Sequence, residues 1–156
     1  MRWDERRKRR LYFLLILMCL GFIWGNSALP GDVSGELSKG VLAKLFGIFG
    51  RFGEKAEFVV RKCAHFSEFA LLGLFALCFV TQWRNSGATR ILLAMFLSLA
   101  AACVDETIQI YTPGRYSSLL DVWVDTAGAF CGCLVLLTIT GIHRCIKSRK
   151  FGKTDV

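Results

Sequence analysis

Apolar residues run through this chain in four long stretches, which polar and charged residues separate. A bilayer core about 30 Å thick is crossed by roughly 17 to 25 helical residues, and each stretch reaches that length. The pattern therefore predicts that four helices cross a membrane. The predicted spans cover residues 11–28, 58–81, 91–111 and 119–142.

A shorter segment between the first two spans, residues 36–53, has helical periodicity instead of continuous hydrophobicity. At about 100° per residue its apolar side chains gather on one half of the helical wheel, opposite Lys39, Lys44 and Arg51. We expect an amphipathic helix in the outer interface, either a surface helix that plugs the bundle or a lid that senses lipid. The predicted fold is an all-α polytopic membrane protein, one domain over residues 1–156, with four transmembrane helices and one interfacial helix.

Composition supports a membrane protein and argues against other classes. Hydrophobic residues make up 54% of the 156 residues, and this excludes a disordered tail protein. The net charge of +8 would suit a nucleic-acid binder, but the basic residues crowd at the two ends and between apolar runs. That distribution is typical of membrane flanks, so we predict no nucleic-acid partner. The seven cysteines lie mostly inside apolar runs without metal-binding spacing, which favours a packing role.

The positive charges also predict the orientation of the chain. Four spans place both termini on one side, and that side carries 13 Lys and Arg residues, against seven on the other. The 13 comprise six before the first span, two between the second and third spans, and five after the fourth. The positive-inside rule then places both termini in the cytoplasm. The first span, preceded by a basic run, is expected to be a retained signal anchor.

Charged side chains inside spans are costly, so their positions point to function. Counted at 1.5 Å per residue from the cytoplasmic ends of their spans, Glu68 and Asp105 lie about 20 and 21 Å deep. Asp121 lies at the outer border of the fourth span, and Asp125 about 6 Å below it. We therefore expect three helices to bring charge to one layer in the outer third of the membrane.

Within each span, the polar residues recur at the spacing of helix neighbours. Arg61, His65 and Glu68 share one stripe of the second span, and Asp105 and Gln109 share a face of the third. This spacing predicts that each helix turns a polar face toward the same layer.

The fourth span and the loop before it complete the layer. Asp121 and Asp125 align with Gly128 and Gly132, and glycines there permit a close approach of another helix. The loop over residues 112–118 is a tight turn that holds Arg115 above the layer.

These segments resemble the VanZ-like membrane proteins. The match consists of Lys62-Cys63-Ala64-His65-Phe66-Ser67-Glu68-Phe69, Leu72-Gly73, Asp105-Glu106-Thr107-Ile108-Gln109, Pro113-Gly114-Arg115, and Asp121 through Asp125 to Gly128 and Gly132. It covers about half of the chain. The resemblance implies a multi-pass protein of the bacterial cell membrane, with some relatives linked to teicoplanin resistance. Asp125 stands where the family pattern more often has asparagine.

The charged residues of the layer do not cancel. Three basic and five acidic side chains leave a formal charge of −2 with histidine neutral. They are Arg61, Lys62 and Arg115, and Glu68, Asp105, Glu106, Asp121 and Asp125. Protons on carboxyl groups, a bound cation or pairing between helices must compensate for this excess.

One hypothesis gives the layer a catalytic role. The candidate catalytic residues are His65, Glu68, Asp105 and Glu106. The candidate substrate-binding residues are Lys62, Gln109, Arg115, Asp121 and Asp125. A carboxylate and the imidazole would serve as base and acid, while Arg115 and Lys62 hold a phosphate or carboxylate. The substrate would be a membrane lipid or a lipid-linked or glycopolymer component of the cell envelope.

Three alternatives stay open at this stage. In one, the same layer binds a headgroup or glycopeptide without chemistry; in another, its polar groups only join the helices. A divalent metal held by His65, Glu68, Glu106 and Asp121 is the least favoured, because there is no second histidine at ligand spacing, and we predict no metal. The sequence identifies neither a cofactor nor an oligomeric state.

Overall fold

The computed structural model describes residues 3–46, 54–83 and 86–151 of the protein. These residues form five helices and contain no strand, so the all-α prediction is confirmed for them. The helices are α1 (Trp3–Ser27), α2 (Gly31–Phe46), α3 (Glu54–Val80), α4 (Gly87–Tyr111) and α5 (Leu119–Phe151).

Four of the helices are long and apolar enough to cross a membrane, as the sequence predicts. The candidate spans are Asp4–Ser27, Phe58–Val80, Gly87–Tyr111 and Leu119–Ser148. α1 and α5 extend beyond the predicted spans into their basic flanks. Hydropathy marks the part of a helix that suits lipid, whereas Lys and Arg are good helix formers and let the helix continue.

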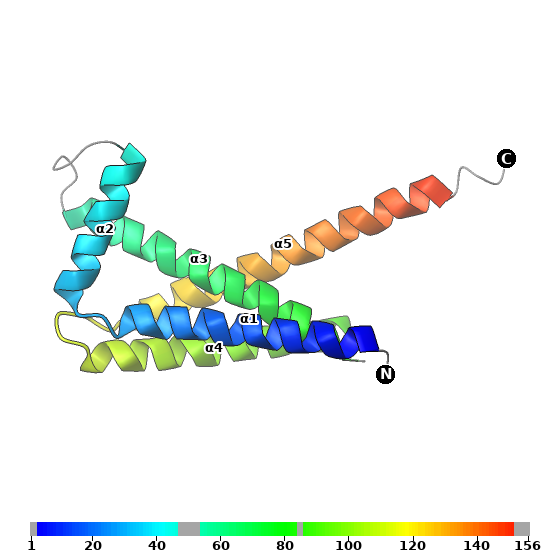
Figure 1. The fold of residues 1–156 in the computed structure, drawn as a ribbon, viewed down its shortest axis with the longest axis horizontal. Helices are drawn as coiled ribbons and strands as arrows, with labels where there is room; N and C mark the ends of the chain where they lie inside the picture. The colour runs from blue at the N-terminus through cyan, green and yellow to red at the C-terminus, as the bar shows by residue number, and fades with distance from the viewer. Residues whose placement is uncertain (1–2, 47–53, 84–85, 152–156) are drawn as a thin grey trace.

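Figure 1 shows α1 and α4 running along each other, with α3 crossing them. The most extensive helix contact joins α3 to α5, and the two termini lie at the same end of the molecule (Figure 1). α2 stands across the opposite end, where it contacts α3. The helices therefore form a bundle with α2 and the loop of residues 112–118 at the end away from the termini.

α2 corrects the predicted start of the interfacial helix. It begins at Gly31 instead of Glu36, directly after Pro30, whose carbonyl accepts a hydrogen bond from the Ser34 N–H at 3.0 Å. Proline has a fixed φ that suits the start of a helix, so the polar residues after it are already helical. The end of the predicted segment, residues 47–53, lies outside the described residues, and its interfacial location stays a prediction.

The contact between α3 and α5 depends on glycine. A Cβ atom added at Gly132 would overlap the backbone carbonyl of Ala70, and one at Gly128 would overlap that of Phe66. The Cys133 thiol donates a hydrogen bond to the Gly73 carbonyl at 3.4 Å in the same contact. The predicted close approach at the two α5 glycines is therefore confirmed, and it fixes where the polar residues of α5 meet α3.

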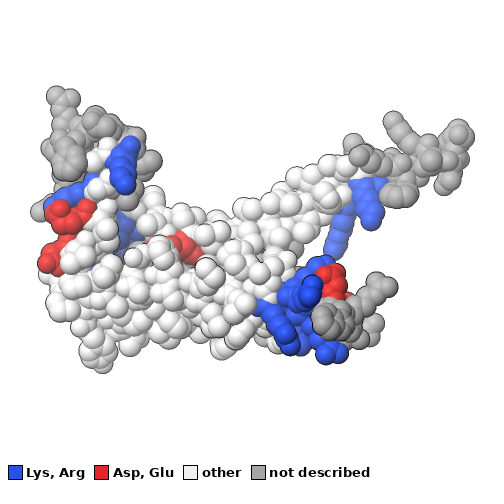
Figure 2. Space-filling model, in the orientation of Figure 1, with Lys and Arg blue, Asp and Glu red and all other residues white. Residues whose placement is uncertain are grey.

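The outward faces of the long helices are apolar. Met18, Leu92 and Phe96 are 71%, 69% and 68% exposed, as side chains that face lipid must be. Figure 2 shows the Lys and Arg side chains gathered toward the two ends of the molecule, with a largely uncharged middle. This distribution matches a bundle that crosses a hydrocarbon layer.

Candidate functional site

A cavity of about 640 Å³ opens at the end of the bundle that α2 covers. All of α2 to α5 and the loop before α5 contribute to its wall. The polar side chains that line it are Ser38, Arg61, Lys62, His65, Glu106, Gln109, Arg115, Tyr116, Ser118, Asp121 and Asp125. The predicted layer of charge therefore corresponds to a cavity shared by several helices.

Seven of the nine candidate site residues line this cavity. They are Lys62, His65, Glu106, Gln109, Arg115, Asp121 and Asp125. Glu68 and Asp105 are not part of its wall. Arg61 also lines the cavity. The sequence places it in the polar stripe of the second span, but it is not among the predicted site residues.

Lys62 and Asp121 form an ion pair between α3 and α5. Their side chains are 27% and 16% exposed, so the pair lies at the edge of the cavity and keeps some contact with solvent. Because each charge is compensated by the other, the pair both joins the helices and leaves little free charge for a ligand.

Arg115 holds the loop before α5 against the end of α1. Its Nη2 donates to the Asn26 carbonyl at 2.7 Å, and its Nε donates to the Leu29 carbonyl at 3.2 Å. Burial lowers the pKa of the guanidinium, and the nearby charge of Arg61 adds to that effect. Since guanidinium is protonated at any ordinary pH, Arg115 brings a fixed positive charge to the cavity.

Glu106 is buried in the wall of the cavity and held from one side. Its Oε2 accepts a hydrogen bond from the Ser118 N–H at 2.9 Å, at the start of α5. Its Oε1 is buried without a hydrogen-bond partner among the described residues. The carboxylate is thus oriented by the loop and keeps one oxygen available, an arrangement that suits a proton acceptor.

Gln109 links Asp105 to α1. The amide Nε2 donates to Asp105 Oδ2 at 2.9 Å and to the hydroxyl of Ser27 at 3.3 Å. The first bond confirms that Asp105 and Gln109 share a face of α4. Ser27 is fully buried and also accepts, through its carbonyl, a hydrogen bond from the Thr112 hydroxyl. These contacts support the interpretation of some polar groups as connections between helices.

Glu68 faces α1 and not the cavity. Its Oε1 accepts a hydrogen bond from the Asn26 amide at 3.2 Å, and its Oε2 is buried without a hydrogen-bond partner among the described residues. Glu68 therefore does not line the cavity that His65 and Glu106 share. Residues three apart on a helix differ by about 60° around its axis, enough to point toward different neighbours.

The sequence analysis did not identify Asn26 and Ser27 as site residues. The feature that could have indicated them is a pair of polar residues at the end of an apolar span.

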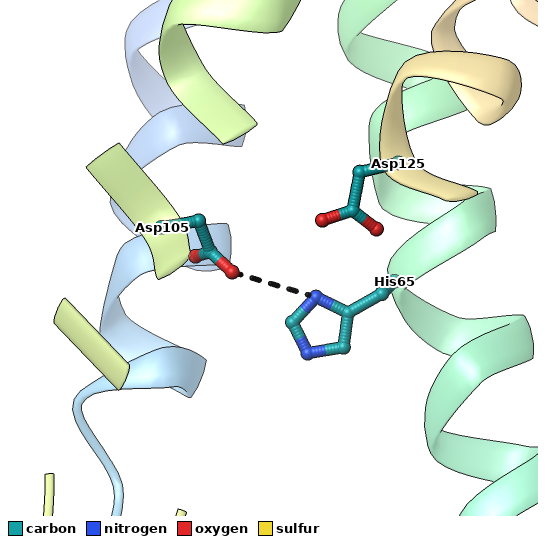
Figure 3. Close-up of side chains that lie close together, drawn as sticks. All are labelled: His65, Asp105 and Asp125. Atoms are coloured by element: carbon teal, nitrogen blue, oxygen red, sulfur yellow. Dashed lines mark ion pairs between the residues drawn. The ribbon is translucent and has the colours of Figure 1, made fainter. Parts of the chain in front are cut away.

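His65, Asp105 and Asp125 come from α3, α4 and α5 and point toward one another (Figure 3). His65 Nδ1 lies 3.8 Å from Asp105 Oδ2, and each of the three residues offers a ligand atom within 4.8 Å of the others. Asp105 is fully buried and Asp125 is 2% exposed. The grouping differs from the metal ligand set considered from the sequence, in which Glu68, Glu106 and Asp121 accompanied His65.

The fold and this cavity define an all-α, multi-pass membrane protein with a polar site at one end of an apolar bundle. The chain belongs to the VanZ/LLP1 family, whose model matches residues 11–140. No curated protein and no solved structure is significantly similar to it.

Proposed function

We propose that the cavity binds the anionic headgroup of a cell-envelope component, a membrane lipid or a lipid-linked or glycopolymer molecule, at the outer face of a bacterial cell membrane. One observation carries this proposal: Arg61, Lys62 and Arg115 lie together in the wall of a cavity of about 640 Å³ at one end of an apolar bundle. A cavity of this size suits a headgroup, and guanidinium groups bind phosphate and carboxylate through forked hydrogen bonds.

Arg61 is the cation that we expect to contact the ligand most directly. Lys62 is paired with Asp121, and two hydrogen bonds of Arg115 are used on backbone carbonyls. Arg61 is half-buried, and it forms no ion pair with any carboxylate whose side chain the structure describes. Its charge would therefore be available to a ligand without loss of a described ion pair.

The charge pattern supports the proposed location at the outer face. The basic segment at the start of α1 and the basic end of α5 lie at the end of the molecule away from α2 and the cavity (Figures 1 and 2). The positive-inside rule assigns that basic end to the cytoplasm. α2, which provides Gly31, Gly35 and Ser38 to the cavity wall, would then lie in the outer interface above the site.

The position of Glu106 favours a second candidate, chemistry on the bound component. The Glu106 carboxylate keeps one buried oxygen without a hydrogen-bond partner among the described residues. It lines the same cavity as Arg61, Lys62 and Arg115, which would hold an anionic substrate. Glu106 would then accept a proton during hydrolysis or transfer. The link of some VanZ-like proteins to teicoplanin resistance makes growth in teicoplanin a suitable cellular readout for either candidate.

Binding to short-chain phosphatidylglycerol tests the proposed function. Purified full-length protein in a neutral detergent is titrated with this anionic lipid and, separately, with phosphatidylcholine, and bound lipid is counted by native mass spectrometry. Arg61→Gln should weaken phosphatidylglycerol binding roughly tenfold, because it removes a charge-assisted contact of about 1.5 kcal/mol.

Arg144→Gln is the matched control, because Arg144 is an exposed cation toward the far end of α5. It should bind phosphatidylglycerol as the wild type does. Equal affinity of the wild type for the two lipids, or equal loss in both variants, would contradict the proposal.

A further inference from the structure

We propose that His65, Asp105 and Asp125 bind a divalent transition-metal ion such as Zn²⁺ or Mn²⁺. Three different helices bring these side chains together, with ligand atoms that all lie within 4.8 Å of one another (Figure 3). Two of the oxygens, Asp105 Oδ1 and Asp125 Oδ2, are buried and have no hydrogen-bond partner among the described residues. Buried oxygens of this kind are costly unless something binds them.

Neither carboxylate forms an ion pair with a Lys or Arg side chain that the structure describes. Asp105 accepts a hydrogen bond from Gln109, which is neutral. Lys62, which lies nearby in the cavity wall, is paired with Asp121. A divalent ion would neutralise both carboxylates, and it would also cancel the formal charge of −2 that the polar layer carries.

The ligand set indicates the class of metal. One imidazole nitrogen and two carboxylate oxygens suit Zn²⁺ and Mn²⁺ better than the soft ions that thiolates select. Zinc bonds of about 2.0–2.2 Å place tetrahedral ligands roughly 3.4 Å apart, so side-chain rotations that move the ligand atoms on the order of 1 Å would complete the site. The hydrogen bond from Gln109 to Asp105 Oδ2 would orient the Asp105 carboxylate, as outer hydrogen bonds do at metal sites.

The cavity would supply the remaining coordination position. His65 and Asp125 line the cavity, whereas Asp105 lies behind them and is fully buried. Three protein ligands leave an open position, which would face the cavity that Arg61 and Arg115 also line. An anionic headgroup could then bind the ion and the guanidinium groups together. This last link rests on the proposed function, whereas the metal site itself does not.

Cobalt binding tests the site directly. Full-length protein purified in detergent is stripped with EDTA, dialysed and titrated with Co²⁺, which reports its ligands through its visible spectrum. We expect one tightly bound ion per chain with the weak bands of nitrogen and oxygen ligation. The seven cysteines are free thiols, so an intense thiolate band would show binding elsewhere and overturn the proposal. Absence of stoichiometric uptake by the wild type would also overturn it.

Two nearly isosteric variants locate the ion. His65→Gln and Asp125→Asn should each weaken Co²⁺ binding by at least tenfold, since each removes a direct ligand. His143→Gln and Asp4→Asn, which change an exposed histidine of α5 and an exposed aspartate of α1, should bind as the wild type does. Retained affinity in His65→Gln would refute the assignment.

The two proposals fail separately. Phosphatidylglycerol binding is measured in EDTA as well as with Co²⁺, and Co²⁺ binding is measured without lipid. Lipid binding without metal uptake would refute the metal site and support the proposed function. Metal uptake without lipid binding would support the metal site and refute the proposed function.

Discussion

A Glu106→Gln variant should lose the chemistry that we propose for the cavity while it keeps the proposed binding of an anionic headgroup. Glutamine preserves the size of the side chain, and its carbonyl can accept the hydrogen bond that the Ser118 N–H donates to Glu106 Oε2. The change removes the carboxylate that we propose as a general base, and loss of a general base lowers the rate by about 10²- to 10⁴-fold. A neutral amide in the cavity wall should leave phosphatidylglycerol affinity unchanged or slightly raised.

Growth of a susceptible bacterial host in teicoplanin provides the activity readout. The wild type should raise the drug concentration that stops growth, and Glu106→Gln should not. Glu36→Gln, at a glutamate whose side chain is 75% exposed on α2, is the matched control and should behave as the wild type. A Glu106→Gln protein that binds phosphatidylglycerol normally and still protects the host would exclude a base role for this residue.

Gly132→Val should produce the largest loss of stability of any single change at the helix contacts. A Cβ atom at this position would overlap the carbonyl of Ala70, and backbone atoms cannot move aside as a flexible side chain can. Overpacking typically costs 1–3 kcal/mol, and we expect a cost of about 3 kcal/mol or more here, with separation of α5 from α3. Thermal unfolding in detergent, followed by circular dichroism, measures the effect.

The same substitution at Gly141 controls for the intrinsic cost of valine in a helix. Gly141 lies on α5 as well, but a Cβ atom there would have no neighbour within 4 Å. Gly141→Val should therefore change the free energy of unfolding by less than about 1 kcal/mol. Similar unfolding temperatures for the two variants would contradict the described contact between α3 and α5.

The spans could be predicted because hydrophobic length decides them almost alone. The limits of the helices could not, since α1 and α5 continue through basic flanks that hydropathy assigns to water. The early start of α2 at Gly31 depends on Pro30, a local backbone effect that an amphipathic pattern does not register. Gly128 and Gly132 predict that another helix approaches α5 closely. No pattern in the sequence identifies Phe66 and Ala70 of α3 as the residues that they contact.

Depth along a helix proved easier to predict than direction around it. The residue count from the ends of the spans predicts that the polar groups lie in one layer, and most of them line one cavity. Glu68 belongs to that layer but faces Asn26 on α1, because a difference of about 60° is enough to change neighbours. The grouping of Asp105 and Asp125 with His65 depends on how three helices cross, which only the tertiary structure supplies.

Accessibility of the loop before α5 is the most direct test that the cavity opens outside the cell. Single cysteines are placed at Ser117, an exposed residue of that loop, and at Ser86, an exposed residue before α4, in a background without native cysteines. Intact cells are then treated with a thiol reagent that does not cross membranes. The orientation proposed here predicts that Ser117→Cys is labelled and that Ser86→Cys is labelled only after the membrane is made permeable. The reverse pattern would place the cavity at the cytoplasmic face and contradict an outer-leaflet ligand.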